Sequence, residues 1–211
     1  IAFINKMDRV GADFNRAVES MRARLGAHPV PIHLPIGAED AFEGVVDLIR
    51  MQAITWDGDG LDSSLLYSEI PENLRTEAEI ARHDLIEAAA EFDEVVMEKY
   101  VHEQPISEEE IVVALRKGTM ASLNPNNPHK PICPVVCGTA LRNKGTRLVL
   151  DAVIDYLPSP QDVGAVAGTD PDNDQVCITR EPSDDAPFAA LAFKILTDPH
   201  VGRLTFVRVY S

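Results

Sequence analysis

Hydrophobic residues recur along the chain with two different periods, which predict an α/β unit at each end of a longer middle section. Residues 1–4 form an uninterrupted apolar run, typical of a parallel strand buried on both faces, and they lead into a polar turn at Asn5. A helix is expected from about Ala12, with apolar residues three and four positions apart and Gly26 as its C-terminal cap. The same order of strand, loop and helix returns at residues 132–157, so two α/β units flank the middle of the chain.

The middle of the chain, residues 29–128, is predicted to be an inserted α+β subdomain because its pattern differs from that of both flanks. Apolar residues alternate from Ile32 to Ile36, as in a β-strand, and residues 45–56 are expected to form one further strand. A single amphipathic helix is expected over residues 71–100. A second helix begins at Ser107 and Glu110, whose spacing is that of a capping box.

The pattern changes again after Pro158. A linker is predicted at residues 159–168, followed by strands of an all-β domain at 176–179, 189–196 and 204–210. The last of these strands is expected to pair with a segment further on, and the chain begins without Met. We therefore interpret the sequence as an excised piece of a longer protein.

The charge of the chain is concentrated in the predicted insertion. The 211 residues include 34 Asp plus Glu and 19 Lys plus Arg, a net charge of −15 that argues against a broad nucleic-acid surface. Residues 37–127 hold 21 of the acidic and 6 of the basic residues, and the remainder holds 13 of each. The charge therefore disfavours nucleic acid for the insertion alone, whose acidic helices are either a solvated face or a docking surface for a basic partner.

The spacing of the cysteines and histidines along the sequence does not predict a metal site. Cys133 and Cys137 lie four positions apart within a predicted strand, and no second pair of ligands is near them in the sequence. With Cys177 they are too few for a disulfide-stapled domain, which indicates a reducing compartment. The sequence has no apolar run near the roughly 18 residues that span a membrane, and no membrane partner is expected.

The turn after the first strand carries the most informative chemistry. Asn5, Lys6 and Asp8 form an Asn-Lys-x-Asp pattern, which suits recognition of guanine. Guanine presents N1–H and its 2-amino group side by side, and one carboxylate, that of Asp8, can accept from both, whereas adenine offers an acceptor there. Lys6 would lay its apolar stem along the base, and Asn5 would donate to the N7 edge.

A second loop is expected to complete the same site. Thr139, Ala140 and Leu141 follow the second predicted core strand. The small Ala140 would let its backbone N–H approach the base carbonyl oxygen. The two loops are thus expected to converge on one base.

Long stretches of the chain resemble elongation factor G, the ribosomal translocase of bacteria and organelles. Residues 5–14 resemble its fourth guanine-nucleotide motif, residues 137–145 its fifth, and residues 150–160 the helix that follows. The segments 43–48 and 193–206 are similar to the start of its G′ insertion and of its β-barrel second domain.

This resemblance implies a fold and a domain plan. Residues 1–28 and 129–163 would form the C-terminal half of a P-loop GTPase domain with a Rossmann-like parallel sheet. Residues 29–128 would be the acidic G′ insertion, and residues 164–211 a linker and the start of the β-barrel domain.

The resemblance also implies GTP and GDP as ligands and the ribosome as partner. The insertion would contact the C-terminal domain of the ribosomal stalk protein, and ribosomal RNA would be bound through domains outside this chain. The implied location is the cytoplasm or an organelle such as the mitochondrial matrix. In the whole protein, GTP hydrolysis would drive translocation of tRNA and mRNA.

Two features depart from the family pattern. The fifth motif usually has Ser where Thr139 stands, but the hydroxyl is retained. The sequence has no Gly-x-x-x-x-Gly-Lys-Ser/Thr phosphate loop and no switch segments, so phosphates and Mg²⁺ would be held elsewhere and no catalytic residue is assigned here. The alternatives are a non-enzymatic acidic docking module with a vestigial nucleotide motif, or a sister ribosome-associated GTPase.

Overall fold

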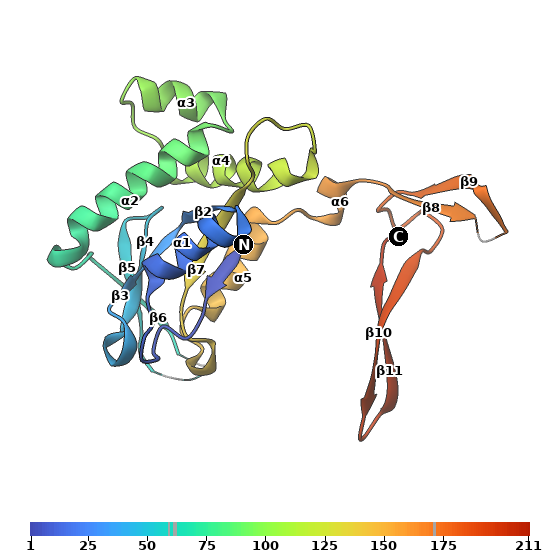
Figure 1. Cartoon of the computed structure of the whole chain (residues 1–211), viewed down its shortest axis with the longest axis horizontal. Coiled ribbons are helices and arrows are strands. Elements are labelled where there is room, and N and C mark those ends of the chain that lie inside the picture. The colour runs from blue at the N-terminus through green and yellow to red at the C-terminus, as the bar shows by residue number, and fades with distance from the viewer. Residues whose placement is uncertain (59, 61–62, 171) are drawn as a thin grey trace. The chain divides into compact units, whose positions relative to one another are not determined.

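The structure, a computed structural model, describes residues 1–58, 60, 63–170 and 172–211 (Figure 1). It forms two compact units, residues 1–157 and residues 158–211, which we describe separately. The first unit contains one parallel and one antiparallel sheet, and the second contains antiparallel hairpins. The predicted mixed α/β fold followed by β-structure is confirmed.

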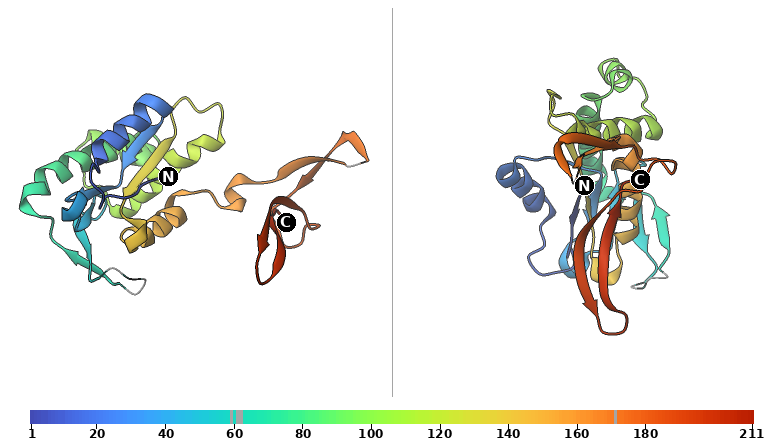
Figure 2. Two further views of the ribbon diagram at one scale, coloured as in Figure 1. Left: turned by 60° about the horizontal axis from the view of Figure 1, so that its bottom comes forward. Right: turned by 90° about the vertical axis from the view of Figure 1, so that its right-hand side faces the viewer.

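A three-stranded parallel sheet lies at the centre of the first unit. Its strands are β1 (Ala2–Ile4), β7 (Ile132–Cys137) and β2 (His28–Pro31), in the order β1-β7-β2 (Figure 2). The central strand β7 is nearly all buried, as expected of a parallel strand covered on both faces. Residues 29–31, which the predicted domain plan assigned to the insertion, thus lie in the parallel sheet.

Two prolines protect the outer edge of β2. The Ile32 N–H, just after the strand, donates to the Val135 carbonyl of β7 at 2.9 Å. Because backbone groups alternate in direction along a strand, Pro29 and Pro31 have their nitrogens turned away from β7. Proline has no N–H, so this edge offers no donor to another strand at these two positions.

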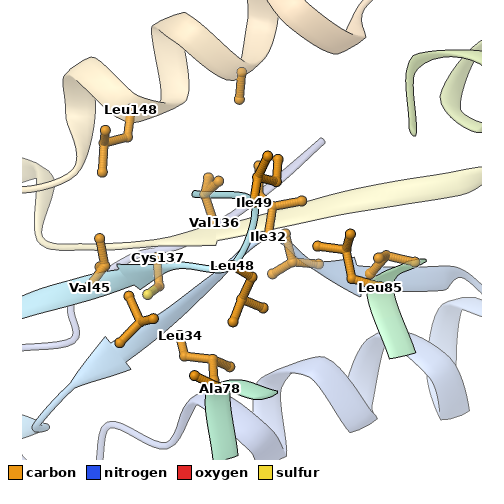
Figure 3. Packing of buried hydrophobic residues seen from close by; sticks show 14 of the residues in the cluster. Ile32, Leu34, Val45, Leu48, Ile49, Ala78, Leu85, Val136, Cys137 and Leu148 are labelled. Carbon is orange, nitrogen blue, oxygen red and sulfur yellow. The ribbon is translucent and has the colours of Figure 1, made fainter. Parts of the chain in front are cut away.

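Helices α1 (Phe14–Leu25) and α5 (Thr146–Tyr156) each follow a strand of this sheet. The Asp13 side chain caps the start of α1 by accepting from the Arg16 N–H, and Gly26 ends it in the left-handed conformation, as predicted. Figure 3 shows Leu148 of α5 on one side of the central strands and Ala78 on the other. The sheet is therefore covered on both faces.

The second sheet is antiparallel, in the order β3-β4-β5-β6. Its strands are β3 (His33–Ile36), β4 (Gly44–Asp47), β5 (Gln52–Trp56) and β6 (Leu65–Ser68), and the short helix η1 (Glu39–Ala41) joins the first two. The prediction of one strand over residues 45–56 is wrong, because the chain reverses after Asp47. The Asp47 carboxylate accepts the Ile49 and Arg50 N–H groups at 2.8 and 3.0 Å, which folds a turn whose apolar residues hide it in the sequence.

Three helices follow: α2 (Glu72–Ala90), α3 (Glu94–Val101) and α4 (Glu108–Met120). The prediction of one helix over residues 71–100 is wrong, since the chain breaks between α2 and α3. The first helix ends with Glu91 as its C-cap, and the Asp93 side chain caps the second by accepting the Val95 and Val96 N–H groups. The capping box of Ser107 and Glu110 at the start of α4 is confirmed, and the short helix η2 (Ala121–Leu123) follows α4.

The insertion and the parallel sheet share one hydrophobic core. Leu48, Leu85 and Val136 come from different parts of the chain and lie in one cluster (Figure 3), to which Leu115 also belongs, and each of the four is no more than 1% exposed. Polar contacts reinforce this packing, because the Arg116 guanidinium on α4 donates to three carbonyls at the end of α5. None of the described helices is long and apolar enough to cross a membrane.

The second unit contains α6 (Pro160–Val163) and two antiparallel hairpins, β8 (Val166–Asp170) with β9 (Asn173–Arg180) and β10 (Ala190–Asp198) with β11 (Gly202–Val209). The three predicted strands are confirmed. The expectation that the last of them pairs with a segment further on is wrong, because it pairs with β10. The linker expected at residues 159–168 is wrong, because it contains α6 and the start of β8. Ser159 and Asp162 form a capping box that starts the short helix.

Candidate functional site

The two predicted loops meet at the carboxyl edge of the parallel sheet. One follows β1 and the other follows β7, and these strands are hydrogen-bonded neighbours. The Gly138 N–H donates to the Ile4 carbonyl at 3.0 Å, and the Met7 N–H donates to the Gly138 carbonyl at 3.1 Å. The Met7 side chain is 1% exposed and anchors the first loop in the core.

Asn5 joins the loops through its side chain. Its Oδ1 accepts the Lys6 N–H at 2.7 Å and the Ala140 N–H at 3.0 Å. These two contacts fix the carboxamide and leave its NH₂ group as the donor toward a ligand. The Ala140 N–H, expected to reach the base carbonyl, is thus engaged by Asn5 in this structure.

Asp8 is held by the second loop. The Thr139 hydroxyl donates to Asp8 Oδ1 at 2.8 Å, and Arg142 Nε lies 3.5 Å from Oδ2. The hydroxyl hydrogen bond, together with the nearby Arg142 and Arg9 charges, lowers the pKa of Asp8 below its ordinary value. The carboxylate is therefore ionised at neutral pH, and its remaining lone pairs can accept two donors side by side.

Lys6 and Leu141 lie at the exposed rim of the site. Lys6 adopts a left-handed backbone conformation with φ of 63°, and its side chain is exposed. Leu141 is 82% exposed and belongs to the short helix η3 (Ala140–Arg142). Both side chains are free of the core, as required of residues that would cover a planar ligand.

Two glycines shape the second loop. A Cβ on Gly138 would lie 2.3 Å from the Lys144 carbonyl oxygen, and one on Gly145 would lie 2.7 Å from the Cys137 carbonyl oxygen. Thr139 and Lys144 pair across the loop through both of their backbone groups. The backbone can therefore close tightly enough to bury the Thr139 side chain, which is 2% exposed.

The structure brings together all six predicted site residues, at the ends of β1 and β7, and it adds contacts that the sequence reasoning missed. Arg142 pairs with Asp8, and its place in a basic segment after the second loop was the available signal. Glu39 accepts the Gly11 N–H at 2.6 Å, and nothing in the sequence pattern links these two residues.

The described residues contain no group of three or more His, Cys, Asp or Glu side chains arranged to hold a metal ion. Cys137 is buried, and burial raises the pKa of its thiol, while Cys133 is half-buried; both are free thiols in β7.

Comparison with known proteins agrees with this architecture. Residues 1–159 match the family model of the elongation factor Tu GTP binding domain. A crystal structure of a protein from Thermus thermophilus superposes over 99% of the chain with a TM-score of 0.69 at 24% sequence identity, a likeness of fold. The chain spans 26% of that protein's length. With the family model covering most of the sequence, the chain belongs to the elongation factor Tu GTP-binding domain family of translational GTPases.

Proposed function

We propose that this chain supplies the guanine-recognition half of the GTP site in a translation factor of the elongation factor G type. The observation that carries the proposal is the Asp8 carboxylate, held by the Thr139 hydroxyl at 2.8 Å beside Asn5. The fixed, ionised carboxylate accepts N1–H and the 2-amino group of guanine. The Asn5 NH₂ group donates to N7, and Lys6 and Leu141 cover the base.

Selectivity follows from the polar pairing. Adenine has no 2-amino group and presents an acceptor at N1, so it would leave the Asp8 carboxylate without its two donors. Sites built to hydrogen-bond one ligand reject an analogue that lacks the group by about 10⁴-fold in favourable cases. We therefore expect guanine nucleotides to bind and adenine nucleotides to be excluded.

The insertion and the second unit favour elongation factor G over other translational GTPases. Beyond β2, the residues proposed for the G′ insertion form an antiparallel sheet and three α-helices between β2 and β7. Residues 164–211 form two hairpins proposed to begin the β-barrel domain. In the whole protein, phosphate-binding and Mg²⁺-binding segments outside this chain would complete the site, and GTP hydrolysis would drive ribosomal translocation.

The test is competition binding with the natural full-length protein. A fluorescent GDP analogue is bound first, and GDP or ADP is then titrated against it. We expect GDP to displace the probe. ADP is expected to leave the probe bound even at a 1,000-fold higher concentration, because the expected preference for guanine is about ten times larger than that excess. Equal displacement by ADP and GDP would refute guanine recognition, and absence of probe binding would favour a vestigial motif.

The exposed acidic residues of the insertion support a second role, the docking of a basic partner. Twelve carboxylates on or beside α2, α3 and α4 are exposed, and the proposed partner is the C-terminal domain of the ribosomal stalk protein. They are Glu69, Glu72, Glu77, Glu79, Asp84, Glu87, Glu91, Glu94, Glu98, Glu103, Glu108 and Glu109.

Such a surface acts mainly on the rate of encounter. We expect the association rate with the stalk domain to fall when Glu77, Glu79 and Asp84 are changed to Lys, and to fall in the unchanged protein as salt rises from about 50 to about 500 mM. Changing Asp184 and Asp185 to Lys in the second unit is the matched control. An association rate that is independent of both salt and these charges would contradict the docking role.

A further inference from the structure

The loop that carries Lys6 and Asp8 is held on a second side by Glu39, which comes from the segment leading into the insertion. Glu39 Oε1 accepts the Gly11 N–H at 2.6 Å, and the Glu39 N–H donates to the Met7 carbonyl at 2.8 Å. One residue thus satisfies two backbone groups on opposite sides of Asp8. The sequence separation of 28 residues makes this a tertiary contact.

The backbone around Glu39 is built for this contact. Glu39 has φ of 55°, a left-handed conformation that costs free energy in a residue other than glycine. Gly37 has φ of 76°, and a Cβ there would lie 1.9 Å from the Ala41 carbonyl oxygen. The tight turn of residues 37–42 therefore directs both the Glu39 side chain and its N–H toward the loop.

The Gly11 carbonyl also accepts from the Arg16 side chain in the first turn of α1 at 3.0 Å, and the other backbone hydrogen bonds between Lys6 and Ala12 are local. The Arg9 N–H donates to the Lys6 carbonyl at 3.1 Å, and the Ala12 N–H donates to the Arg9 carbonyl at 3.0 Å. These short-range turns move together with the loop and do not fix it to the sheet. Met7 and Asp8 are tied to the loop after β7, and Glu39 supplies the brace to the other side.

We propose that Glu39 is a positioning residue for guanine recognition: it clamps the loop of residues 5–11 from the insertion side so that Lys6 and Asp8 are held in place before the base arrives. This inference rests on the proposed function of the loop. Pre-organisation of this kind lowers the ordering cost of binding and slows ligand release. The segment that leads into the insertion thus takes part directly in the nucleotide site.

The test compares Glu39→Ala, Glu39→Gln and Asp40→Ala in the natural full-length protein. Asp40→Ala is the matched control because it removes an exposed carboxylate from the same short helix. The first measurement is the dissociation rate of a fluorescent GDP analogue by stopped flow. We expect Glu39→Ala to speed release by about 10-fold, as for loss of a hydrogen bond to a charged group, and Asp40→Ala to leave it unchanged.

Rescue by glutamine separates positioning from folding. The Gln Oε1 can still accept the Gly11 N–H, so Glu39→Gln is expected to restore a release rate within about 3-fold of the unchanged protein. A Glu39→Ala release rate equal to that of Asp40→Ala would overturn the proposal. The proposal would also be overturned if both Glu39 variants released the analogue fast and both had a lowered unfolding temperature, because general destabilisation would then explain the release.

A second measurement does not need nucleotide. Hydrogen exchange of the peptide covering residues 5–13 is expected to be faster in Glu39→Ala than in Asp40→Ala in the nucleotide-free protein. Equal exchange would overturn the clamp itself. If the unchanged protein failed to bind GDP while Glu39→Ala still exchanged faster, the guanine function would be wrong and only the structural brace would stand.

Discussion

At the scale of single residues, the Thr139 hydroxyl is the group that fixes Asp8. It is buried and donates to the Asp8 carboxylate from a loop 131 residues away. A carboxylate free to rotate would have to be ordered each time a base bound. The hydroxyl therefore contributes to affinity without touching the ligand.

Changing Thr139 to Val tests this contribution. The volume is nearly kept while the donor is lost, and a hydrogen bond to a charged group is worth about 1.5–3 kcal/mol. We expect the dissociation constant for GDP to rise by at least about 10-fold. Calorimetric titration of the full-length protein measures it, and Thr139→Ser, which retains the hydroxyl, is expected to stay within about 3-fold. Equal affinities of the Val and Ser variants would contradict the role of the hydroxyl.

His33 is a second residue with a measurable consequence, this time for stability. It is 6% exposed, and its Nδ1 has no hydrogen-bond partner among the described residues. Burial lowers the pKa of His33 to about 4, although Asp47 acts in the opposite direction. The unfolded chain therefore binds a proton at His33 between pH 6.5 and about 4, whereas the folded protein does not.

The stabilisation that comes from keeping His33 neutral is therefore complete above pH 6.5 and is lost as the pH falls toward 4. We expect His33 to add up to one proton, about 1.4 kcal/mol per pH unit, to the slope of the unfolding free energy in that range. His33→Gln is expected to make this slope shallower than in the unchanged protein. His102→Gln, at an exposed position, is expected to change the slope less. Urea unfolding at several pH values measures the slope, and an unchanged slope in His33→Gln would be contrary to expectation.

At the scale of elements, hydrophobic periodicity predicts what lies inside a strand or helix better than where one ends. The strands β1 and β7 and the capped helix α1 could be predicted because buried runs and capping residues are local signals. The breaks at Asp47 and Asp93 could not, because each depends on a side-chain carboxylate that accepts backbone N–H groups two and three residues later. Amphipathic periodicity simply continues across them.

Gly118 shows how packing against neighbouring residues favours glycine within a helix. It is buried in α4, where a Cβ would lie 2.5 Å from Ile132 Cδ1 and 2.9 Å from the Phe92 ring. Alanine would gain about 1 kcal/mol of helix propensity, but overpacking costs about 1–3 kcal/mol.

We expect Gly118→Ala to lower the unfolding free energy by up to about 2 kcal/mol. Denaturant unfolding measures this change, with Val113→Ala at a half-exposed position of the same helix as the comparison, expected within about 0.5 kcal/mol. A Gly118→Ala variant more stable than the unchanged protein would show that the helix has room for the methyl group.

At the scale of the whole molecule, the first unit joins an acidic insertion to flanking segments, residues 1–36 and 128–157, that hold 9 basic and 5 acidic residues, and both parts share one hydrophobic core. The six candidate site residues could be grouped from sequence because each follows a recognisable core strand. The Glu39 and Arg142 contacts could not, because they depend on how separate segments pack. Sequence patterns therefore point to the candidate residues at the ends of β1 and β7, but not to the contacts that Glu39 and Arg142 make with the loop of residues 5–11.

Exchange of nucleotide specificity tests the central claim most directly. Asp8→Asn replaces an acceptor-only carboxylate by a carboxamide that can donate to the 2-oxo group of xanthine. Binding of GDP and of xanthosine diphosphate is compared in the full-length protein and this variant. We predict that the unchanged protein prefers GDP and that the variant prefers xanthosine diphosphate. A variant that keeps its preference for GDP would contradict the assignment of Asp8 to the guanine edge.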